Sequence, residues 1–386
     1  MPASDVAATE PVNAAPEVLS PALVTPPVET SPAAAQPASS VGPTAGLPAY
    51  FQPGILMQGW IVLERLGKTG TSTARLRRAE IYLKGKVIPD RVSYLIMFDV
   101  ARVLEPQSSV IKVDNQDPAP SDPKKPESVK VKQSKGAVAA LQDYYMQLTT
   151  DYADVYFGQF KIPVSYDGSQ TPPYALLMPD RSTPTIYFDD RRDIGLKATK
   201  KFTYLRYTAA VFNGAGQNTL DNNNGKDVAL RLDLYPFEGV GVGAVGYYTV
   251  AKLRHKAAND RYEADIHVEH AGVFVQAEYM QSHLAAYTVT PGATGYLDAR
   301  GAYAMAAYTI AEDYQPVIRI SYLDPDTKTN LKPKASTDLD EYWQYEVGFN
   351  YYVQKNTVKL QAAGSHIEYE NKTSLNQIIV GAQIWY

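Results

Sequence analysis

The five histidines are the first candidates for a metal site, and their spacing argues against one. They are His255, His267, His270, His283 and His366. Only His267 and His270 are close, and a spacing of three on a strand places them on opposite faces. The chain has no cysteine, so it cannot form a disulfide, a thiolate zinc site or a cysteine nucleophile. We therefore expect no metal ion.

Three other patterns resemble reactive or binding motifs without completing one. Residues 221–225 carry acidic and amide oxygens but lack the length and the closing Glu of a calcium loop, so a hairpin loop is expected. Residues 239–246 alternate glycine with other residues, but no helix follows that would bind a dinucleotide phosphate. The Ser, His and Asp residues are too scattered for a triad. We expect no cofactor and no enzyme; a hydrolase embedded in a barrel is a remote alternative.

Basic residues at alternate positions of apolar segments offer a different chemistry, which is the passage of anions. Arginine suits this role because its planar fork donates two parallel hydrogen bonds to an oxyanion and keeps its charge. The candidates are Arg78, Lys84, Lys161, Arg191, Lys197, Arg206, Arg231, Arg319 and Lys359. The same faces also carry carboxylates: Glu80, Asp99, Asp193, Asp233, Glu263, Asp265, Glu278 and Glu346. The alternative for each cation is therefore an ion pair with one of these carboxylates, which would stiffen the sheet and bind no anion.

The elements that position these cations are strands. From Gly54 onward, apolar and polar residues alternate in segments of about ten, rich in Tyr, Val, Ile and Thr, which is the period of a strand. Sixteen strands are predicted: 55–63, 74–86, 91–103, 137–149, 152–161, 188–200, 203–213, 226–235, 240–251, 260–269, 272–282, 298–311, 315–323, 342–353, 357–370 and 376–386.

The connections between these strands alternate in length along the chain. Short turns follow every second strand, and the longer polar links are 64–73, 104–136, 162–187, 214–225, 252–259, 283–297, 324–341 and 371–375. Bacterial outer-membrane barrels have short periplasmic turns and long outer loops, and an even strand number brings both termini to one side. A soluble sandwich has no reason to sort its loops in this way.

The size of the barrel determines which face of each strand contacts lipid and which faces the interior. In residues 228–235 the residues Val228, Leu230, Leu232 and Leu234 share one face of the strand. The interior of a sixteen-stranded barrel is too wide for side chains to fill. The polar faces of the strands must therefore line water, and the apolar faces must contact lipid. A transmembrane helix needs about 18 apolar residues, and the run at 240–251 is too short. The sequence therefore predicts a 16-stranded antiparallel transmembrane β-barrel.

Tyrosines near predicted strand ends fit the aromatic belts of a membrane barrel, where an amphipathic ring prefers the headgroup level. They are Tyr144, Tyr145, Tyr152, Tyr156, Tyr247, Tyr248, Tyr342, Tyr345, Tyr351 and Tyr352. For any single one of these residues, ordinary sheet packing is the alternative.

The chain divides into an arm, residues 1–50, and a barrel, residues 51–386. The arm is rich in Ala and Pro and cannot bury enough apolar surface to fold, so we expect a disordered periplasmic spacer that contacts peptidoglycan or acts as a passive linker. The first cation is Arg65, so the sequence lacks the positively charged N-terminal region of a secretory signal peptide. We therefore expect either a processed, mature chain or a cytoplasmic one. The net charge is −4, which argues against nucleic acid as a partner.

Four blocks of this sequence resemble the phosphate-selective porin O and P family. They are residues 76–85 (LRRAEIYLKG), 156–163 (YFGQFKIP), 192–195 (RDIG) and 211–216 (VFNGAG). With the aromatic C-terminus, the resemblance covers roughly residues 54–386. It implies a sixteen-stranded outer-membrane porin, typically a homotrimer, whose third long loop folds into the lumen and whose basic residues conduct anions. The Ala/Pro arm is not part of the family's pattern.

The resemblance also singles out Arg181, which lies in the 162–187 link that matches the family's third loop. Arg181 is expected to be the basic residue of the constriction, and an exposed arginine paired to Asp180 is the alternative. The lysine-rich 104–136 link could attract anions to the outer mouth or contact lipopolysaccharide.

Together these features predict a channel in the bacterial outer membrane. Its surroundings are outer-membrane lipid and lipopolysaccharide, and its cargo is small anionic solutes such as phosphate, with a modest preference over cations because residues 51–386 are electrically balanced. The alternative is a structural or adhesive outer-membrane protein that is tethered to the cell wall through residues 1–50.

Overall fold

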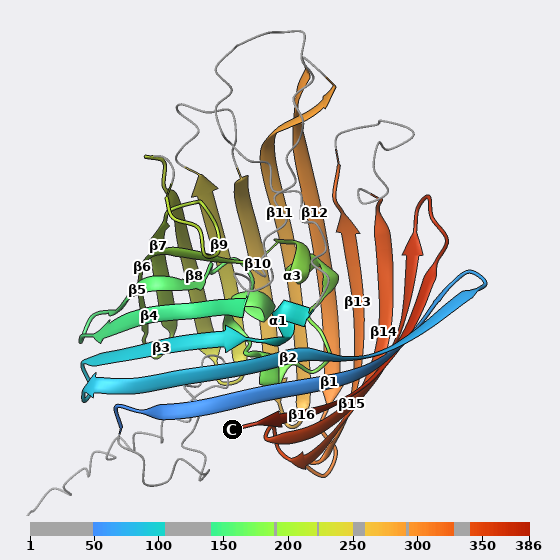
Figure 1. The fold of residues 1–386 in the computed structure, drawn as a ribbon, viewed down its shortest axis with the longest axis horizontal. Helices are drawn as coiled ribbons and strands as arrows, with labels where there is room; N and C mark the ends of the chain where they lie inside the picture. The colour runs from blue at the N-terminus through green and yellow to red at the C-terminus, as the bar shows by residue number, and fades with distance from the viewer. Residues whose placement is uncertain are drawn as a thin grey trace, which may run out of the picture.

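Sixteen strands close into one antiparallel barrel in the computed structural model of the chain (Figure 1). The structure describes residues 49–104, 140–188, 191–221, 224–249, 259–290, 293–327 and 340–386. Most of the proposed arm, the 105–136 part of the lysine-rich link and the first three residues of the predicted strand 137–149 lie outside these ranges. The sixteen predicted strands are confirmed, with these bounds: β1 (Gln52–Leu66), β2 (Thr69–Ile88), β3 (Val92–Asp99), β4 (Leu141–Thr149), β5 (Asp154–Lys161), β6 (Arg192–Lys201), β7 (Leu205–Phe212), β8 (Asp227–Phe237), β9 (Val240–Thr249), β10 (Asn259–His270), β11 (Val273–Thr290), β12 (Ala293–Tyr308), β13 (Tyr314–Asp324), β14 (Tyr342–Gln354), β15 (Val358–Tyr369) and β16 (Leu375–Trp385).

The ring closes where the last strand meets the first. β16 pairs with β1 from Leu56 opposite Trp385 to Leu66 opposite Leu375. The terminal residue extends this seam, because Ile55 and Tyr386 exchange two backbone hydrogen bonds of 3.0 and 3.1 Å. Backbone groups within a membrane must be satisfied internally, and a closed barrel achieves this for strands.

Short turns at one end of the barrel follow from residues that accept a left-handed backbone. Between β10 and β11 only Ala271 and Gly272 remain, and both have positive φ, 49° and 81°. Two consecutive residues with positive φ form the hairpin turn whose twist matches that of the flanking strands.

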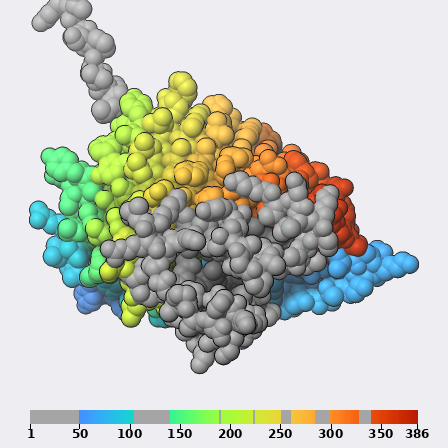
Figure 2. Space-filling view, turned by 90° about the horizontal axis from the view of Figure 1, so that it is seen from above, coloured from blue at the N-terminus to red at the C-terminus, as the bar shows by residue number. Residues whose placement is uncertain are grey.

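Two of the predicted long links are wrong, because strands run through them. β1 and β2 continue to Leu66 and Thr69, so the 64–73 link is a hairpin whose strands pair almost to its tip. This hairpin projects beyond the rest of the described barrel (Figure 2, blue). β11 and β12 likewise extend through most of the 283–297 link. In residues 64–73 Leu66 is the only apolar residue, so no apolar row indicates a strand, and in residues 283–297 Pro291 and two glycines favour a loop.

The barrel wall is inverted relative to a soluble protein, as predicted. Along β8 the leucines Leu230, Leu232 and Leu234 are 55%, 46% and 53% exposed, while Arg231 and Asp233 between them are each 1% exposed. A lipid-facing apolar row and an inward polar row on one strand are typical of a transmembrane barrel.

The tyrosine prediction holds for only part of its set. Tyr152, Tyr248, Tyr345 and Tyr351 are exposed on the outer surface. The prediction is wrong for Tyr145, Tyr156, Tyr247, Tyr342 and Tyr352, because the strand register turns these five into the lumen. A position near a strand end does not reveal the face on which the ring lies.

Candidate channel and constriction

The link between β5 and β6, residues 162–188, lies inside the barrel, and we call it loop L3. It contains a π-helical turn (Tyr166–Gln170), a 3-10 turn (Pro173–Ala175) and the short helix α3 (Thr183–Phe188). Wall side chains hold its backbone carbonyls: Gln58 donates to Pro173, Asn350 to Leu177, and Lys359 to Tyr174 and Leu176, at 2.8–3.2 Å. Because these donors belong to the inward rows of β1, β14 and β15, the predicted inward fold of this loop is confirmed.

Apolar packing holds the other part of L3 against the wall. Met178 and Phe188 are each 1% exposed and pack with Met280, Tyr303 and Met305 on β11 and β12. The lumen therefore contains a small hydrophobic core on the side of β11–β15. L3 therefore lies against this side of the lumen.

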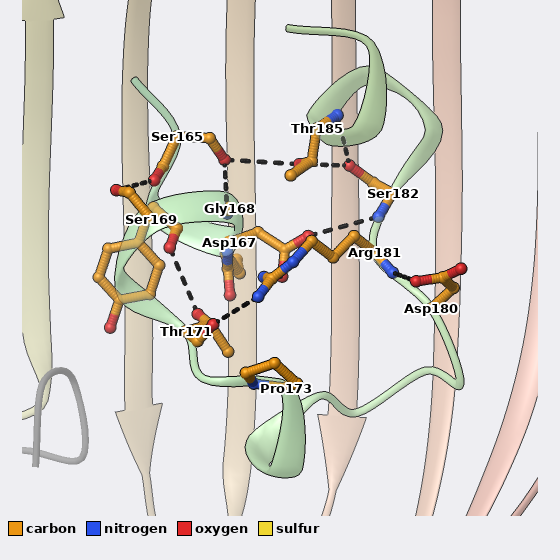
Figure 3. A network of polar contacts seen from close by, with 12 residues as sticks. Ser165, Asp167, Gly168, Ser169, Thr171, Pro173, Asp180, Arg181, Ser182 and Thr185 are labelled. Carbon is orange, nitrogen blue, oxygen red and sulfur yellow. Dashed lines mark hydrogen bonds and ion pairs between the residues drawn. The ribbon is translucent and has the colours of Figure 1, made fainter. Parts of the chain in front are cut away.

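The first turn of L3 is fixed by one wall carboxylate, Glu278 on β11. Glu278 accepts from the Ser165 hydroxyl at 2.6 Å and from the backbone N–H of Asp167 at 2.7 Å. Gln276 and Tyr303 on the wall donate to the same carboxylate. Ser165 in turn caps the turn by accepting from Gly168 N–H at 2.9 Å (Figure 3). The sequence predicts Glu278 only as a carboxylate for ion pairs on a polar face, and no local pattern reveals this role.

Arg181 braces the interior of L3. Its guanidinium donates to the carboxylate of Asp167 at 3.3 Å and to the carbonyl of Thr171 at 2.8 Å, and its side chain is 2% exposed (Figure 3). The alternative expected from the sequence, an exposed arginine paired to Asp180, is wrong, because Arg181 is buried and donates to Asp180 through its backbone N–H and not through its guanidinium. The expected role of Arg181 in binding anions stays a prediction.

Asp180 ties the far end of L3 to β2. Arg77 donates to it through Nε at 2.9 Å and Nη2 at 3.3 Å, and Arg78 donates through Nη2 at 2.9 Å. Burial would raise the pKa of Asp180, but Arg77 and Arg78 outweigh this effect and hold the pKa below its usual value. Arg77 was missed by the sequence analysis because a β-bulge next to Gln58 brings two consecutive arginines to the lumen side.

The other wall arginines form ion pairs. Arg206 donates to Asp233 at 2.9 Å, and Arg231 donates to Asp233 at 2.9 Å and Glu263 at 2.7 Å and also contacts Asp265. Arg319 forms a two-pronged pair with Glu346. These three arginines therefore form ion pairs that stiffen the barrel wall, which was the alternative to anion binding. Carboxylates outnumber cations among the buried side chains of the described residues, so the wall has no overall positive excess.

The lumen-side lysines differ from the arginines. Within the described residues, Lys84, Lys197, Lys201 and Lys359 have no carboxylate within ion-pair distance. Each lies over an aromatic ring instead: Lys84 over Tyr82 at 6.0 Å, Lys197 over Tyr156 at 4.2 Å, Lys201 over Tyr235 at 4.6 Å and Lys359 over Tyr352 at 5.8 Å. All four occupy the half of the barrel next to the short turns. Lys201 was missed because the sequence analysis placed it in a turn.

Two candidates lie at the junction of L3 with its flanking strands. Lys161 donates to the carbonyl of Gly168 at 2.6 Å, so it supports the first turn of L3. Arg191 precedes β6 and is exposed, and its guanidinium reaches the carbonyl of Tyr187 at 3.4 Å. The predicted strand began too early; the next residue, Arg192, takes the buried position and pairs with Asp143 through two bonds of 3.1 Å.

None of the helices in the described ranges is long and apolar enough to cross a membrane. Across the same residues, no cluster of His, Asp and Glu side chains is arranged to hold a metal ion.

Comparisons with known proteins agree with this geometry. Residues 65–253 match the family model described as phosphate-selective porin O and P. No curated protein sequence matches the chain.

The fold is similar to solved porins at low sequence identity. An anion-selective porin from Comamonas acidovorans has a TM-score of 0.58 at 7% identity over 87% of this chain and 99% of that chain. The outer-membrane channel DcaP of Acinetobacter baumannii has a TM-score of 0.58 at 10% identity over 87% and 97% of the two chains. A loop-deletion mutant of OmpT from Vibrio cholerae has a TM-score of 0.56 at 12% identity over 87% and 99%.

Proposed function

We propose that the chain, whose residues 65–253 match the phosphate-selective porin O and P family, is an outer-membrane porin that passes small solutes with a modest preference for anions such as phosphate. Solutes diffuse through the water-filled part of the lumen beside L3. No residue undergoes chemistry; the profile of charge along the passage determines which ions enter.

The observation that carries the anion preference is the contrast between arginines and lysines. Arg206, Arg231 and Arg319 are neutralised by wall carboxylates and add little net field. Lys84 and Lys197 have no carboxylate partner in the described part of the chain and remain only partly buried on the inward rows of β2 and β6. Unpaired ammonium groups beside low-dielectric walls raise the local concentration of anions.

L3 supports the same preference at the constriction. Arg77 and Arg78 both donate to the carboxylate of Asp180, so two guanidinium groups lie where L3 meets β2. Arg181 contributes through the position of the loop as well as through its charge, because its guanidinium joins Asp167 to Thr171. Of the remaining predicted cations, Lys161 and Lys359 contribute by holding carbonyls of L3, and Arg191 is exposed beside the loop.

We propose further that the chain forms a homotrimer and that residues 1–50 are a periplasmic spacer separate from the barrel, residues 51–386. A similar structure of OmpT from Vibrio cholerae, with a TM-score of 0.50 at 10% identity, is described as a trimer form. The Ala/Pro composition of the arm favours an extended chain that reaches peptidoglycan. If deleting residues 1–48 leaves envelope attachment unchanged, contact with peptidoglycan is excluded.

The direct test is a planar-bilayer recording of the full chain in a gradient of potassium chloride. The expected result is a stable open channel whose zero-current potential has the sign of chloride preference. Lys84→Gln and Arg181→Glu should each reduce that preference, while Lys226→Gln, which removes a lysine paired to Asp221 in an outer loop, should not. Negligible conductance or a potential of the opposite sign would exclude the anion channel.

A further inference from the structure

A second feature of the lumen is an aromatic corner on β4, β5 and β6 that contains one lysine. The rings of Tyr145 and Tyr156 meet edge to face with centroids 5.1 Å apart, and Phe160 lies 6.4 Å from Tyr156. The Lys197 ammonium lies 4.2 Å from the Tyr156 ring centre and 4.6 Å from that of Phe160. Strand pairing places Tyr156 directly opposite Lys197, so these groups share the inward face.

The two tyrosine hydroxyls in this corner have no hydrogen-bond partner within the described ranges. Other lumen tyrosines are satisfied: Tyr247 donates to Asp227, Tyr303 to Glu278 and Tyr352 to Gln315. Tyr145 and Tyr156 are only partly buried, and neither hydroxyl is among the fully buried polar atoms without a partner. The corner therefore presents one ammonium and two hydroxyl donors without a carboxylate at ion-pair distance.

The β3 side of the corner is apolar, and charged residues adjoin it: Asp143 and Asp154 act on the two tyrosines, and Lys84 on β2 lies opposite Leu95. Leu95 on β3 lies opposite Tyr145, and Met97 follows it on the same inward row; both are partly buried. A fully hydrated inorganic anion gains nothing from these surfaces. An anion that carries a ring can bury the ring against tyrosine and leucine while its acid group meets the donors.

We propose that Tyr145, Tyr156 and Lys197 form a subsite for organic acids with an aromatic or apolar body. The carboxylate of such a solute accepts from Lys197 and from the tyrosine hydroxyls, and its ring packs against the aromatic corner. This subsite rests on the proposed anion channel and narrows its solute class from anions in general to amphipathic carboxylates.

The test compares benzoate with acetate as blockers of chloride current through single channels of the full chain. Both carry one carboxylate, so only the ring distinguishes them. An aromatic contact of typical strength lowers the half-blocking concentration of benzoate relative to acetate by roughly fivefold. Tyr145→Leu and Tyr156→Leu should each bring this ratio towards one, and Lys197→Gln should weaken block by both acids.

Matched controls lie on the opposite face of the same strands. Tyr144→Leu and Lys200→Gln change residues that flank the subsite in sequence but lie outside the inward rows, and they should leave the benzoate-to-acetate ratio at its native value. Resistance of the native-like barrel to detergent before heating identifies variants that have folded.

The outcomes separate the subsite from the channel. Equal block by the two acids in a chloride-preferring native channel, or an unchanged ratio in folded Tyr156→Leu, overturns the subsite and leaves the anion channel intact. A native channel without chloride preference that still distinguishes benzoate from acetate rejects the proposed selectivity and keeps the aromatic subsite.

Discussion

At the residue scale, arginines and lysines on the same inward rows have different surroundings. Alternation places Arg231 and Lys197 on a polar face once their strands are known. It cannot tell which cation is neutralised, because the carboxylates come from neighbouring strands: Glu263 and Asp265 on β10 pair with Arg231 on β8. Cross-strand partners depend on register, which a single sequence does not fix at this precision.

Asp180→Asn is the sharpest single-residue prediction. The change removes the carboxylate shared by Arg77 and Arg78, so the constriction gains one net positive charge. A unit charge acting at about 4 Å in water-like surroundings is worth about 1 kcal/mol, so chloride preference should rise by up to about fivefold. The zero-current potential in a potassium chloride gradient measures this change, and a shift towards potassium would contradict it.

The acidity of Asp180 sets the pH range of this prediction. Its folded pKa lies below the usual aspartate value, because Arg77 and Arg78 outweigh the opposing effect of burial. A depressed folded pKa stabilises the loop contact above the unfolded value of about 3.9, and the contribution is lost as the pH falls through the lower folded pKa. Native and Asp180→Asn channels should therefore differ at pH 5 as they do at pH 7.

At the element scale, L3 was predicted as a loop that enters the lumen, but its internal fold was not. The positions of Ser165, Asp167 and Arg181 depend on a wall residue more than ninety positions away, Glu278. The same limit explains the β1–β2 hairpin, where a polar stretch forms paired strands outside the region that an apolar pattern can mark. Contacts between distant segments decide both features.

Glu278→Ala tests the anchoring of L3. The substitution leaves the Asp167 N–H and the Ser165 hydroxyl without their acceptor, and each buried unsatisfied group costs about 1–3 kcal/mol. We expect the first turn of L3 to detach, giving larger and noisier single-channel currents from a barrel that still folds, because the strand ladder is untouched.

The control for this variant is Glu64→Gln. Glu64 lies on the inward row of β1 and accepts from Gln377 on β16 without contacting L3. Its substitution should leave the current amplitude and noise at native values. Native-like currents in Glu278→Ala would show that this carboxylate does not hold the loop.

At the scale of the whole molecule, the number of strands, their antiparallel closure and the outward apolar rows follow from alternation and loop lengths alone. These properties depend on a period of two repeated along more than 300 residues, so errors at single boundaries do not change them. The size of the passage left beside L3 could not be predicted, because it depends on how Met178 and Phe188 pack on the far wall.

The central claim is that one face of each strand meets water and the other meets lipid, and the absence of cysteine makes it directly measurable. Single cysteines introduced by Leu196→Cys, Lys197→Cys, Ala198→Cys and Thr199→Cys sample consecutive positions of β6. In the reconstituted channel, a negatively charged thiol reagent added from water should react at positions 197 and 199 and reduce the current there. It should spare positions 196 and 198. Reaction at 196 and 198 instead, or at all four positions alike, would show that these faces are not divided between water and lipid.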